Sequence, residues 1–499
     1  MTTYSSSFFA CLLWLLILPT VGAAQEPGVP PNIILVMADD LGTEAVGCYG
    51  GTSYPTPVLD RMAATGMRFD HGYAYPLCTP TRVSIMTGKY NFRNWRAFGI
   101  LDPAEKTFGH LMQEAGFRTC MVGKWQLQSY DPPGFPGSEL RRNTGMHVED
   151  AGFDEYCMWH TGHTEDKGSR FAAPLLYQNG EFLTNTNDQY GPDVFTDYLL
   201  DFISRSKEAP FFAYYPMALT HGPFVPTPDS EEWQDATLHH GEDKKYFGDM
   251  VTYADKLMGR LLDHLEKEGL AENTLVLFYS DNGTHRSISS MANGKEVWGG
   301  KTLPNDSGTR VPLIAYWKNR ITPGSRSEEM VSSSDFIPTI LEAAGLEVPA
   351  DFQTDGQSFY PTLVGGDSKR KDWVYIDYDP MPGWDKAHLT PSTFVKGKRY
   401  KLYDDGRFYD VDQDPLEERP FVELNPELVD LKERYQVILD SLRKYPTIGY
   451  LESLTSAFDK LVPPHTKIEV IATGHTWTEG PVWVPAQQCL LYSDVPRNI

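Results

Sequence analysis

The chain has 499 residues, enough for more than one domain and a large buried core. Its 44 Lys and Arg residues against 67 Asp and Glu residues leave a net charge of −23. This balance argues against a general nucleic-acid binder, which normally carries a basic field, so we expect no nucleic-acid partner. It does not exclude a small anionic substrate, because a few clustered cations can act inside an acidic protein.

The N-terminal residues contain an apolar stretch from Phe8 to Leu18, which is too short to span a bilayer comfortably. Small residues follow it up to Ala24, as they do before a signal-peptidase site. We therefore expect residues 1–24 to be a cleaved signal peptide, with an uncleaved anchor as the alternative. The mature protein would then be exported, either periplasmic or secreted, without stable membrane insertion.

Continuous apolar stretches that end in polar turns predict buried strands at several places. Residues 32–42 (NIILVMADDLG) and 274–283 (TLVLFYSDNG) each run into acidic or amide residues and a glycine. Helical periods alternate with the strands, which is typical of an α/β fold with a large mixed, mainly parallel sheet sandwiched by helices. Further strands are expected at residues 210–224 and 310–317, and helices at residues 56–65, 84–88, 107–115, 194–206 and 334–344.

From about Trp373 the pattern changes to short strands followed by one long helical stretch. Asp405-Gly406 is typical of a hairpin turn between two of these strands, and Asn425 is a suitable N-cap for the helix. We expect a smaller α+β subdomain with an antiparallel sheet, packed on the main domain. The expected division is a signal peptide (1–24), a main domain (32–365), this C-terminal subdomain (366–447) and a tail (466–499).

Four oxygen donors follow two of the predicted strands: Asp39 and Asp40 after one, Asp281 and Asn282 after the other. In such a sheet the ligand site lies at the carboxyl ends of the strands, so we expect these side chains to converge. Oxygen ligands without His or thiolate favour Ca²⁺, with Mg²⁺ as the alternative, over zinc. Taken singly, each pair also fits a turn at a strand end, and Asn282-Gly283-Thr284 fits a glycosylation acceptor.

Cys78 opens the stretch CTPTRVSIMTG, residues 78–88. A lone cysteine is more often buried and inert than reactive. Here the pattern Cys-x-Pro-x-Arg, followed by Thr-Gly, resembles the signature of the formylglycine-dependent sulfatases of the alkaline phosphatase superfamily. The resemblance implies that a formylglycine-generating enzyme reads Pro80 and Arg82 and oxidises Cys78 to formylglycine. Thr81 stands where that family usually has Ser or Ala, but the core of the pattern is intact.

The resemblance extends along the chain in family order, from about residue 32 to residue 445. FRTCMVGKWQLQ is similar to the family's Gly-Lys-Trp-His-Leu motif, and ALTHGPF is similar to its segment with a sulfate-contacting histidine. The other matching motifs are residues 32–42 with Asp39 and Asp40, FYSDNG with Asp281 and Asn282, and WGGKTLPNDSGTRVPLI with Lys301.

The resemblance implies an arylsulfatase-like sulfuric ester hydrolase that acts on a carbohydrate or aryl-type sulfate ester. Its nucleophile would be the hydrated formylglycine, a diol, which attacks sulfur and whose second hydroxyl then expels sulfate. A divalent metal would activate this diol. The implied metal ligands are Asp39, Asp40, Cys78, Asp281 and Asn282.

The family's remaining motif residues imply how the substrate is held. Lys124, His221 and Lys301 would neutralise charge on the sulfate oxygens, and His221 or Lys301 would protonate the leaving alcohol. Arg82 would pair with a metal carboxylate or hold the diol. The implied catalytic residues are Cys78, Arg82, Lys124, His221 and Lys301, and the implied substrate-binding residues are Lys124, Gln126, His221 and Lys301.

Gln126 departs from the family, which has a histidine there that is thought to take a proton during sulfate release. Glutamine cannot act as a base at neutral pH. Either another base serves, with His285 as a candidate, or turnover is slow. Two other functions therefore stay open beside sulfate-ester hydrolysis: a phosphonate or phosphodiester hydrolase of the same superfamily, and an inactive binder of sulfated glycans. The loops expected to set specificity are residues 129–144, 159–170 and 380–391.

The last residues, with TWTEGPVW and LLYSDV, resemble the first blade of a gluconolactonase-type β-propeller. In that family the counterpart of Glu479 binds a metal. About 35 residues cannot form a closed propeller. We expect residues 466–499 to be a truncated propeller-like tail, and we assign no function to Glu479.

Overall fold

The structure is a computed structural model that describes residues 30–135, 137–160 and 167–442 and four short strands beyond them. The signal peptide expected at residues 1–24 lies outside this part of the chain. None of the helices in the described part is long and apolar enough to cross a bilayer. The four strands near the C-terminus are β17 (Thr447–Tyr450), β18 (Lys467–Glu469), β19 (Thr478–Val484) and β20 (Cys489–Asp494).

A ten-stranded mixed sheet forms the centre of the described part, with strand order β12-β2-β11-β8-β1-β7-β3-β4-β5-β6. The pairs from β8 to β4 through β1, β7 and β3 are all parallel, whereas β11 pairs antiparallel with both of its neighbours. The strands are β1 (Asn32–Ala38), β2 (Met67–Tyr73), β3 (Arg118–Lys124), β4 (Glu155–Trp159), β5 (Tyr177–Gln178), β6 (Glu181–Phe182), β7 (Phe211–Pro216), β8 (Thr274–Ser280), β11 (Leu313–Tyr316) and β12 (Ser325–Ser332).

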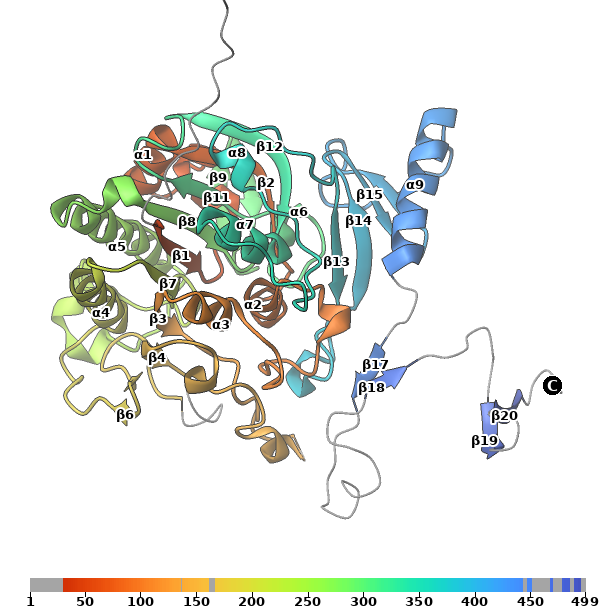
Figure 1. The fold of residues 1–499 in the computed structure, drawn as a ribbon, viewed down its shortest axis with the longest axis horizontal. Coiled ribbons are helices and arrows are strands. Elements are labelled where there is room, and N and C mark those ends of the chain that lie inside the picture. The colour runs from red at the N-terminus through yellow and green to blue at the C-terminus, as the bar shows by residue number, and fades with distance from the viewer. Residues whose placement is uncertain are drawn as a thin grey trace, which may run out of the picture.

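Helices cover both faces of this sheet, as Figure 1 shows. The helices of the main domain are α1 (Pro57–Thr65), α2 (Cys78–Thr87), α3 (Phe108–Glu114), α4 (Gly191–Ser206), α5 (Tyr246–Lys267), α6 (Asp306–Thr309), α7 (Phe336–Ala343) and α8 (Tyr360–Leu363), whereas α9 (Pro426–Leu442) packs on a smaller, separate sheet. The expected α/β fold with a mainly parallel central sheet is confirmed.

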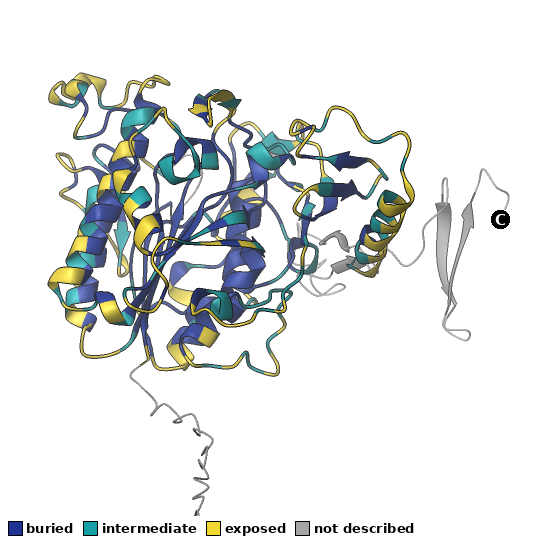
Figure 2. Cartoon of the chain, turned by 90° about the horizontal axis from the view of Figure 1, so that it is seen from above, coloured by how far each residue is buried: buried dark blue, intermediate teal, exposed yellow. Residues whose placement is uncertain are grey.

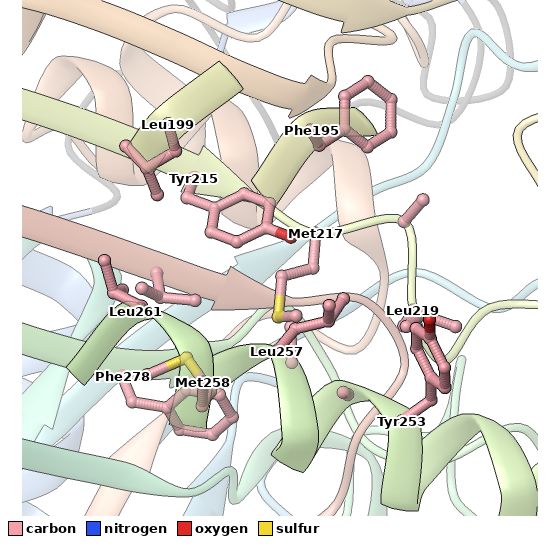
Figure 3. Close-up of a cluster of buried hydrophobic side chains, with 14 of the residues drawn as sticks. Phe195, Leu199, Tyr215, Met217, Leu219, Tyr253, Leu257, Met258, Leu261 and Phe278 are labelled. Carbon is pink, nitrogen blue, oxygen red and sulfur yellow. The ribbon is translucent and has the colours of Figure 1, made fainter. Parts of the chain in front are cut away.

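Successive side chains of a strand point to opposite faces, and β1 therefore feeds two separate hydrophobic cores. Ile34 and Val36 pack with α1, α4 and α5, while Ile33, Leu35 and Met37 pack with α2, α3 and α7. Figure 3 shows part of the first core, between α4, α5 and the sheet, and Figure 2 shows how the helices expose their outer sides. This double cover keeps the central strands buried up to their carboxyl ends.

α2 begins at Cys78, six residues before the helix that the sequence predicts at residues 84–88. All ten residues of α2 are buried, so the helix shows no alternation between a polar and an apolar face. Pro80 lies in its first turn, where backbone N–H groups have no partner within the helix and proline is tolerated.

A four-stranded antiparallel sheet and α9 form the smaller C-terminal part, as expected. α9 packs Tyr435 and Leu439 on one side of this sheet. Tyr378 and Tyr403 of the same sheet lie in a cluster with Cys78, so the small sheet backs onto the start of α2. The strands are β13 (Val374–Tyr378), β14 (Ser392–Lys396), β15 (Tyr400–Tyr403) and β16 (Phe408–Asp410); β9 (Ser289–Ala292) and β10 (Lys295–Trp298) form a separate hairpin.

Asp255 of α5 joins two helices of the first core. Its carboxylate accepts hydrogen bonds from the N–H groups of Val58 (3.0 Å) and Leu59 (2.8 Å), two of the orphan donors at the start of α1. Burial raises the pKa of Asp255 to about 6, although both N–H groups favour its ionised form.

We expect this carboxyl to make the protein less stable as pH rises. Because the pKa of Asp255 is higher in the folded chain than in the unfolded chain, its contribution is complete below about pH 4 and is lost as pH rises through about 6. The free energy of unfolding of the natural chain, minus that of Asp255→Asn, should fall by about 2 kcal/mol between those pH values. Urea unfolding of both chains across this range measures it, and a difference that stays constant with pH would contradict it.

Candidate active site

The carboxyl ends of β1 and β8 bring four oxygen-bearing side chains together. These strands are parallel neighbours, and their last residues are paired in the register. The N–H of Asp40 donates to Asp281 Oδ1 (3.0 Å), and Asn282 Nδ2 donates to Asp40 Oδ1 (2.8 Å). Asp39, Asp40, Asp281 and Asn282 are fully buried. The two strand ends therefore form one compact acidic centre.

Three cations from different elements neutralise these carboxylates. Lys124, the last residue of β3, donates to both Asp39 oxygens (3.0 and 2.8 Å), and Lys301 donates to Asp40 Oδ2 (2.6 Å). Arg82 of α2 donates to Asp281 Oδ2 (2.8 Å) and lies 3.6 Å from Asp39 Oδ1. The same guanidinium donates to the carbonyl of Lys124 (3.2 Å), so it ties α2 to both β3 and β8.

These ion pairs keep the carboxylates of Asp39 and Asp40 charged. Burial alone would raise the pKa of Asp39, but Lys124 and the neighbouring cations outweigh burial and hold that pKa well below its usual range. For Asp40 burial also opposes ionisation, and Lys301 contributes most to the lowered pKa. Buried charges of both signs therefore share one centre, an arrangement that is common at functional sites.

Cys78 lies at the start of α2, at the edge of this centre. It is buried, and its thiol is free. Arg82 follows it by four residues and so lies on the same side of the helix. Thr81 Oγ1 donates to the carbonyl of Asp281 (2.6 Å), which fixes the first turn of α2 against the end of β8. Burial alone would lower the pKa of Lys301, but the Asp40 carboxylate outweighs burial and raises that pKa above its usual value.

His221 follows β7, the other neighbour of β1. Its Nδ1 lies 2.6 Å from the carbonyl of Gly222. Because a carbonyl only accepts, Nδ1 carries the proton and Nε2 is left as an acceptor in the neutral ring. Nε2 lies 3.9 Å from Asp40 Oδ2, and His221 forms with Asp39 and Asp40 a group whose ligand atoms could hold one metal ion.

Gln126 lies two residues beyond Lys124, in a left-handed backbone conformation with φ of 52°. Its Oε1 is buried and has no hydrogen-bond partner among the described residues. His285, the base that the sequence offers in its place, is exposed, and its Nδ1 lies 2.9 Å from Ser287 Oγ. The structure therefore places His285 at the outside of the site, and its role as a base stays a prediction.

Two further basic residues, which no sequence motif identifies, lie beside the site. His160 directly follows β4, and its Nδ1 is buried without a partner among the described residues. Arg170 is buried, its guanidinium stacks 4.2 Å from the centre of the Trp159 ring, and its NH1 lies 3.8 Å from Asp39 Oδ2. The sequence only places both within a loop expected to set specificity, residues 159–170.

Two cavities adjoin at His221 and Gly222. The first, of about 460 Å³, is named here the basic cavity, and the second, of about 590 Å³, the mixed cavity. The wall of the basic cavity includes Trp159, Lys167, Arg170, His221, His239 and His240. The wall of the mixed cavity includes His221, Phe224, Glu242, Asp243, Lys244 and His285. Both cavities open beside the acidic centre, because His221 belongs to it.

Two family models match this chain. The sulfatase model matches residues 31–346, and the model of the C-terminal region of N-sulphoglucosamine sulphohydrolase matches residues 294–444. The arylsulfatase of Hemicentrotus pulcherrimus is 31% identical over 408 residues, covering 77% of this chain and 72% of that protein. The N-acetylgalactosamine-6-sulfatase of Canis lupus familiaris is 31% identical over 413 residues, covering 76% and 75%.

Solved structures share the fold. One, a complex with its substrate D-glucosamine-2-N,6-O-disulfate, has a TM-score of 0.66 at 23% identity and covers 83% of this chain and 98% of that one. A sulfatase from Pseudoalteromonas sp. has a TM-score of 0.64 at 21% identity and covers 88% and 92%. This chain belongs to the sulfatase family. It is a sulfuric ester hydrolase.

The predicted propeller-like tail receives no support from these comparisons. The family models end at residue 444, before the expected tail at residues 466–499. In the described part of that tail, β19 and β20 form an antiparallel pair in which Glu479 lies opposite Ser493. A resemblance to one propeller blade therefore stays a prediction.

Proposed function

We propose that this sulfatase releases sulfate from an ester of a carbohydrate, using Cys78 in its formylglycine form and a divalent cation, Ca²⁺ or Mg²⁺. The observation that carries the proposal is the convergence of four buried oxygen-bearing side chains, three cations and the start of α2 at one edge of the sheet. Curated relatives named N-acetylgalactosamine-6-sulfatase and N-acetylglucosamine-6-O-sulfatase support a carbohydrate ester as the substrate.

The residues at the two strand ends fit a metal ion. Sulfatases are generally metal-dependent, and Asp39, Asp40, Asp281 and Asn282 would hold the ion through oxygen atoms. Asn282 Nδ2 already donates to Asp40 and to the carbonyl of Gly283, yet Asn282 Oδ1 is buried without a partner among the described residues. An unpaired buried oxygen beside two carboxylates is suited to a hard cation. When bound, that cation would supply Lewis-acid stabilisation of negative charge on nearby oxygens.

The surroundings of Cys78 fit its conversion to formylglycine. The Cys-x-Pro-x-Arg pattern is intact, and Cys78 lies one helical turn before Thr81 and Arg82, which both bond to Asp281, rather than in either of the two large cores. The modified residue would supply a nucleophilic oxygen that can later be released from the transferred group. A formylglycine-generating enzyme would act on the chain before folding buries position 78.

The cations of the site would hold the sulfate and move the proton. Lys124 and Lys301 already point at the acidic centre, so their ammonium groups would stabilise the charge that develops on sulfate oxygens. His221 is oriented by its bond to Gly222, and its neutral ring offers Nε2 only as an acceptor. Lys301, an ammonium group that carries its protons, is therefore better placed than His221 to protonate the leaving alcohol.

Sulfate release from the full chain, produced together with a formylglycine-generating enzyme, tests this function. We expect release from 4-nitrophenyl sulfate and from 6-O-sulfated N-acetylhexosamines. A chelator should lower the rate at least about tenfold, and added Ca²⁺ or Mg²⁺ should restore it. Binding of a sulfated glycan without release would indicate the inactive binder, whereas sulfate release would show that Gln126 does not stop turnover. If an aryl phosphonate is hydrolysed faster than the sulfate esters, the result would favour a phosphonate or phosphodiester hydrolase of the same superfamily.

We also propose that the protein is exported, because residues 1–24 have the composition of a signal peptide. The N-terminal residue of the mature chain checks the expected cleavage near Ala24.

A further inference from the structure

We propose that the basic cavity binds a second anionic group of the substrate, a sulfate or a carboxylate, while the acidic centre holds the sulfate that is hydrolysed. This inference rests on the proposed function and deepens it, since it makes the preferred substrate a carbohydrate with at least two negative charges. The cavity meets the acidic centre at Arg170 and His221, so one small ligand could occupy both.

Arg170 is the first reason for this proposal. NH2 of Arg170 donates to the carbonyl of Gly222 (2.9 Å), and the stacking on Trp159 holds the guanidinium plane in place. NH1 is buried and makes no hydrogen bond among the described residues; Asp39 Oδ2 is 3.8 Å away. A buried guanidinium donor without an acceptor is costly, and an anion in the cavity would supply that acceptor.

Lys167 is the second reason. Its ammonium lies 5.9 Å from the centre of the Trp159 ring, on the same side chain that Arg170 stacks against. Burial lowers the pKa of Lys167 to about 8, and Arg170, Lys124 and Lys386 add to this effect. Lys124 is paired with Asp39 and Lys386 with Asp385, whereas Lys167 and Arg170 both lie against the Trp159 ring and line the basic cavity. An anion in the basic cavity would relieve the repulsion between Lys167 and Arg170.

The two cavities differ in a way that decides which one takes the anion. The mixed cavity has Glu242 and Asp243 in its wall beside Lys244. None of the described residues that line the basic cavity is a carboxylate, and its wall instead has Lys167, Arg170 and three histidines. An anionic substituent is therefore favoured on the basic side, and uncharged hydroxyl groups on the mixed side.

The test measures equilibrium binding, so that it does not depend on turnover. The full chain with Cys78→Ala is saturated with Ca²⁺ and titrated with two sugars, glucosamine 6-O-sulfate and N-acetylgalactosamine 6-O-sulfate. Each is compared with two doubly charged forms, one with a second sulfate and one linked to a uronic acid. We expect at least one doubly charged form to bind about tenfold or more tightly than its singly charged parent. Tighter binding of the form with a second sulfate indicates a sulfate as the second anion, and tighter binding of the form with a uronic acid indicates a carboxylate.

Variants test whether the basic cavity causes the tighter binding of the doubly charged sugar. Lys167→Gln and Arg170→Gln should each reduce it to about threefold or less, while Lys207→Gln should keep it, because Lys207 is an exposed lysine paired with Glu268. Lys167 is only half-buried, so Lys167→Gln is expected to fold even if Arg170→Gln does not. High salt should weaken the preference.

The proposal is overturned if the doubly charged forms bind no more than about twofold better, if no form binds, or if Lys167→Gln keeps the full preference. The proposed function fails separately, when the unaltered chain releases no sulfate from any of the sulfate esters, whether singly or doubly charged.

Discussion

Replacing Cys78 by serine is expected to lower kcat for sulfate-ester hydrolysis by about 10⁴-fold to 10⁶-fold, the range found when one member of a catalytic unit is removed. A serine hydroxyl can still attack sulfur, which forms a serine sulfate and frees the alcohol. The carbon of that serine has no second hydroxyl to expel the sulfate, so the chain stops after one turnover. Mass spectrometry of the peptide with position 78 should therefore show a bound sulfo group in Cys78→Ser after exposure to substrate.

The same peptide from the natural chain gives the matching control. A mass about 18 Da below that of the cysteine peptide indicates formylglycine. Cys48→Ser is the control variant, because Cys48 is another free cysteine and lies in a short turn beside α1. Full activity of Cys78→Ser, or an unmodified cysteine in an active natural chain, would exclude formylglycine as the source of the nucleophile.

The central strands could be predicted from the sequence because burial on both faces leaves a strong local pattern. β1 and β8 are continuous apolar runs that end in polar residues, and their parallel pairing follows from the alternation with helices. The direction of β11 could not be predicted in this way. Residues 310–317 have the same apolar character as the parallel strands, yet β11 lies antiparallel between β8 and β2.

The sequence predicts α2 too short, because this helix leaves no clear pattern of polar and apolar faces. Its surroundings bury every residue from Cys78 to Thr87, so tertiary packing rather than an amphipathic period sets where it begins. The local residues Thr79, Pro80 and Thr81 are weak helix formers. The helix start nevertheless decides the site, since it places Cys78 and Arg82 on one side, toward the strand ends.

The candidate site could be predicted where a motif carries it, and not elsewhere. The acids after β1 and β8 and the cations Lys124 and Lys301 belong to motifs, and the structure brings them within hydrogen-bond distance. Arg170 lies in a loop without periodic pattern, and its position depends on stacking against Trp159 and on the carbonyl of Gly222. Such contacts between distant segments leave no local signal in the sequence.

Replacing Arg82 by methionine is expected to lower the free energy of unfolding by about 3–5 kcal/mol, the cost of breaking a buried ion pair by removing one partner. The Arg82 side chain is 1% exposed, and methionine fills much of its volume without its charge. Asp281 would lose the cation at 2.8 Å, and the carbonyl of Lys124 would lose a donor. Because α2, β3 and β8 all meet at this guanidinium, the loss loosens the site as well as the fold.

Urea unfolding in the presence of a chelator measures this effect without a contribution from bound metal. Arg205→Met is the matched control: Arg205 also forms ion pairs, with Glu155 and Asp201, but its side chain is 41% exposed. Its loss should cost no more than about 1 kcal/mol, because water and salt screen such pairs. The opposite result would be that Arg82→Met lowers the free energy of unfolding no more than Arg205→Met does. In that case the carboxylates that Arg82 faces, Asp39 and Asp281, would have to be neutral or hydrated in the folded chain. The acidic centre would then not be the dry, charged site on which the proposed metal binding and sulfate recognition both depend.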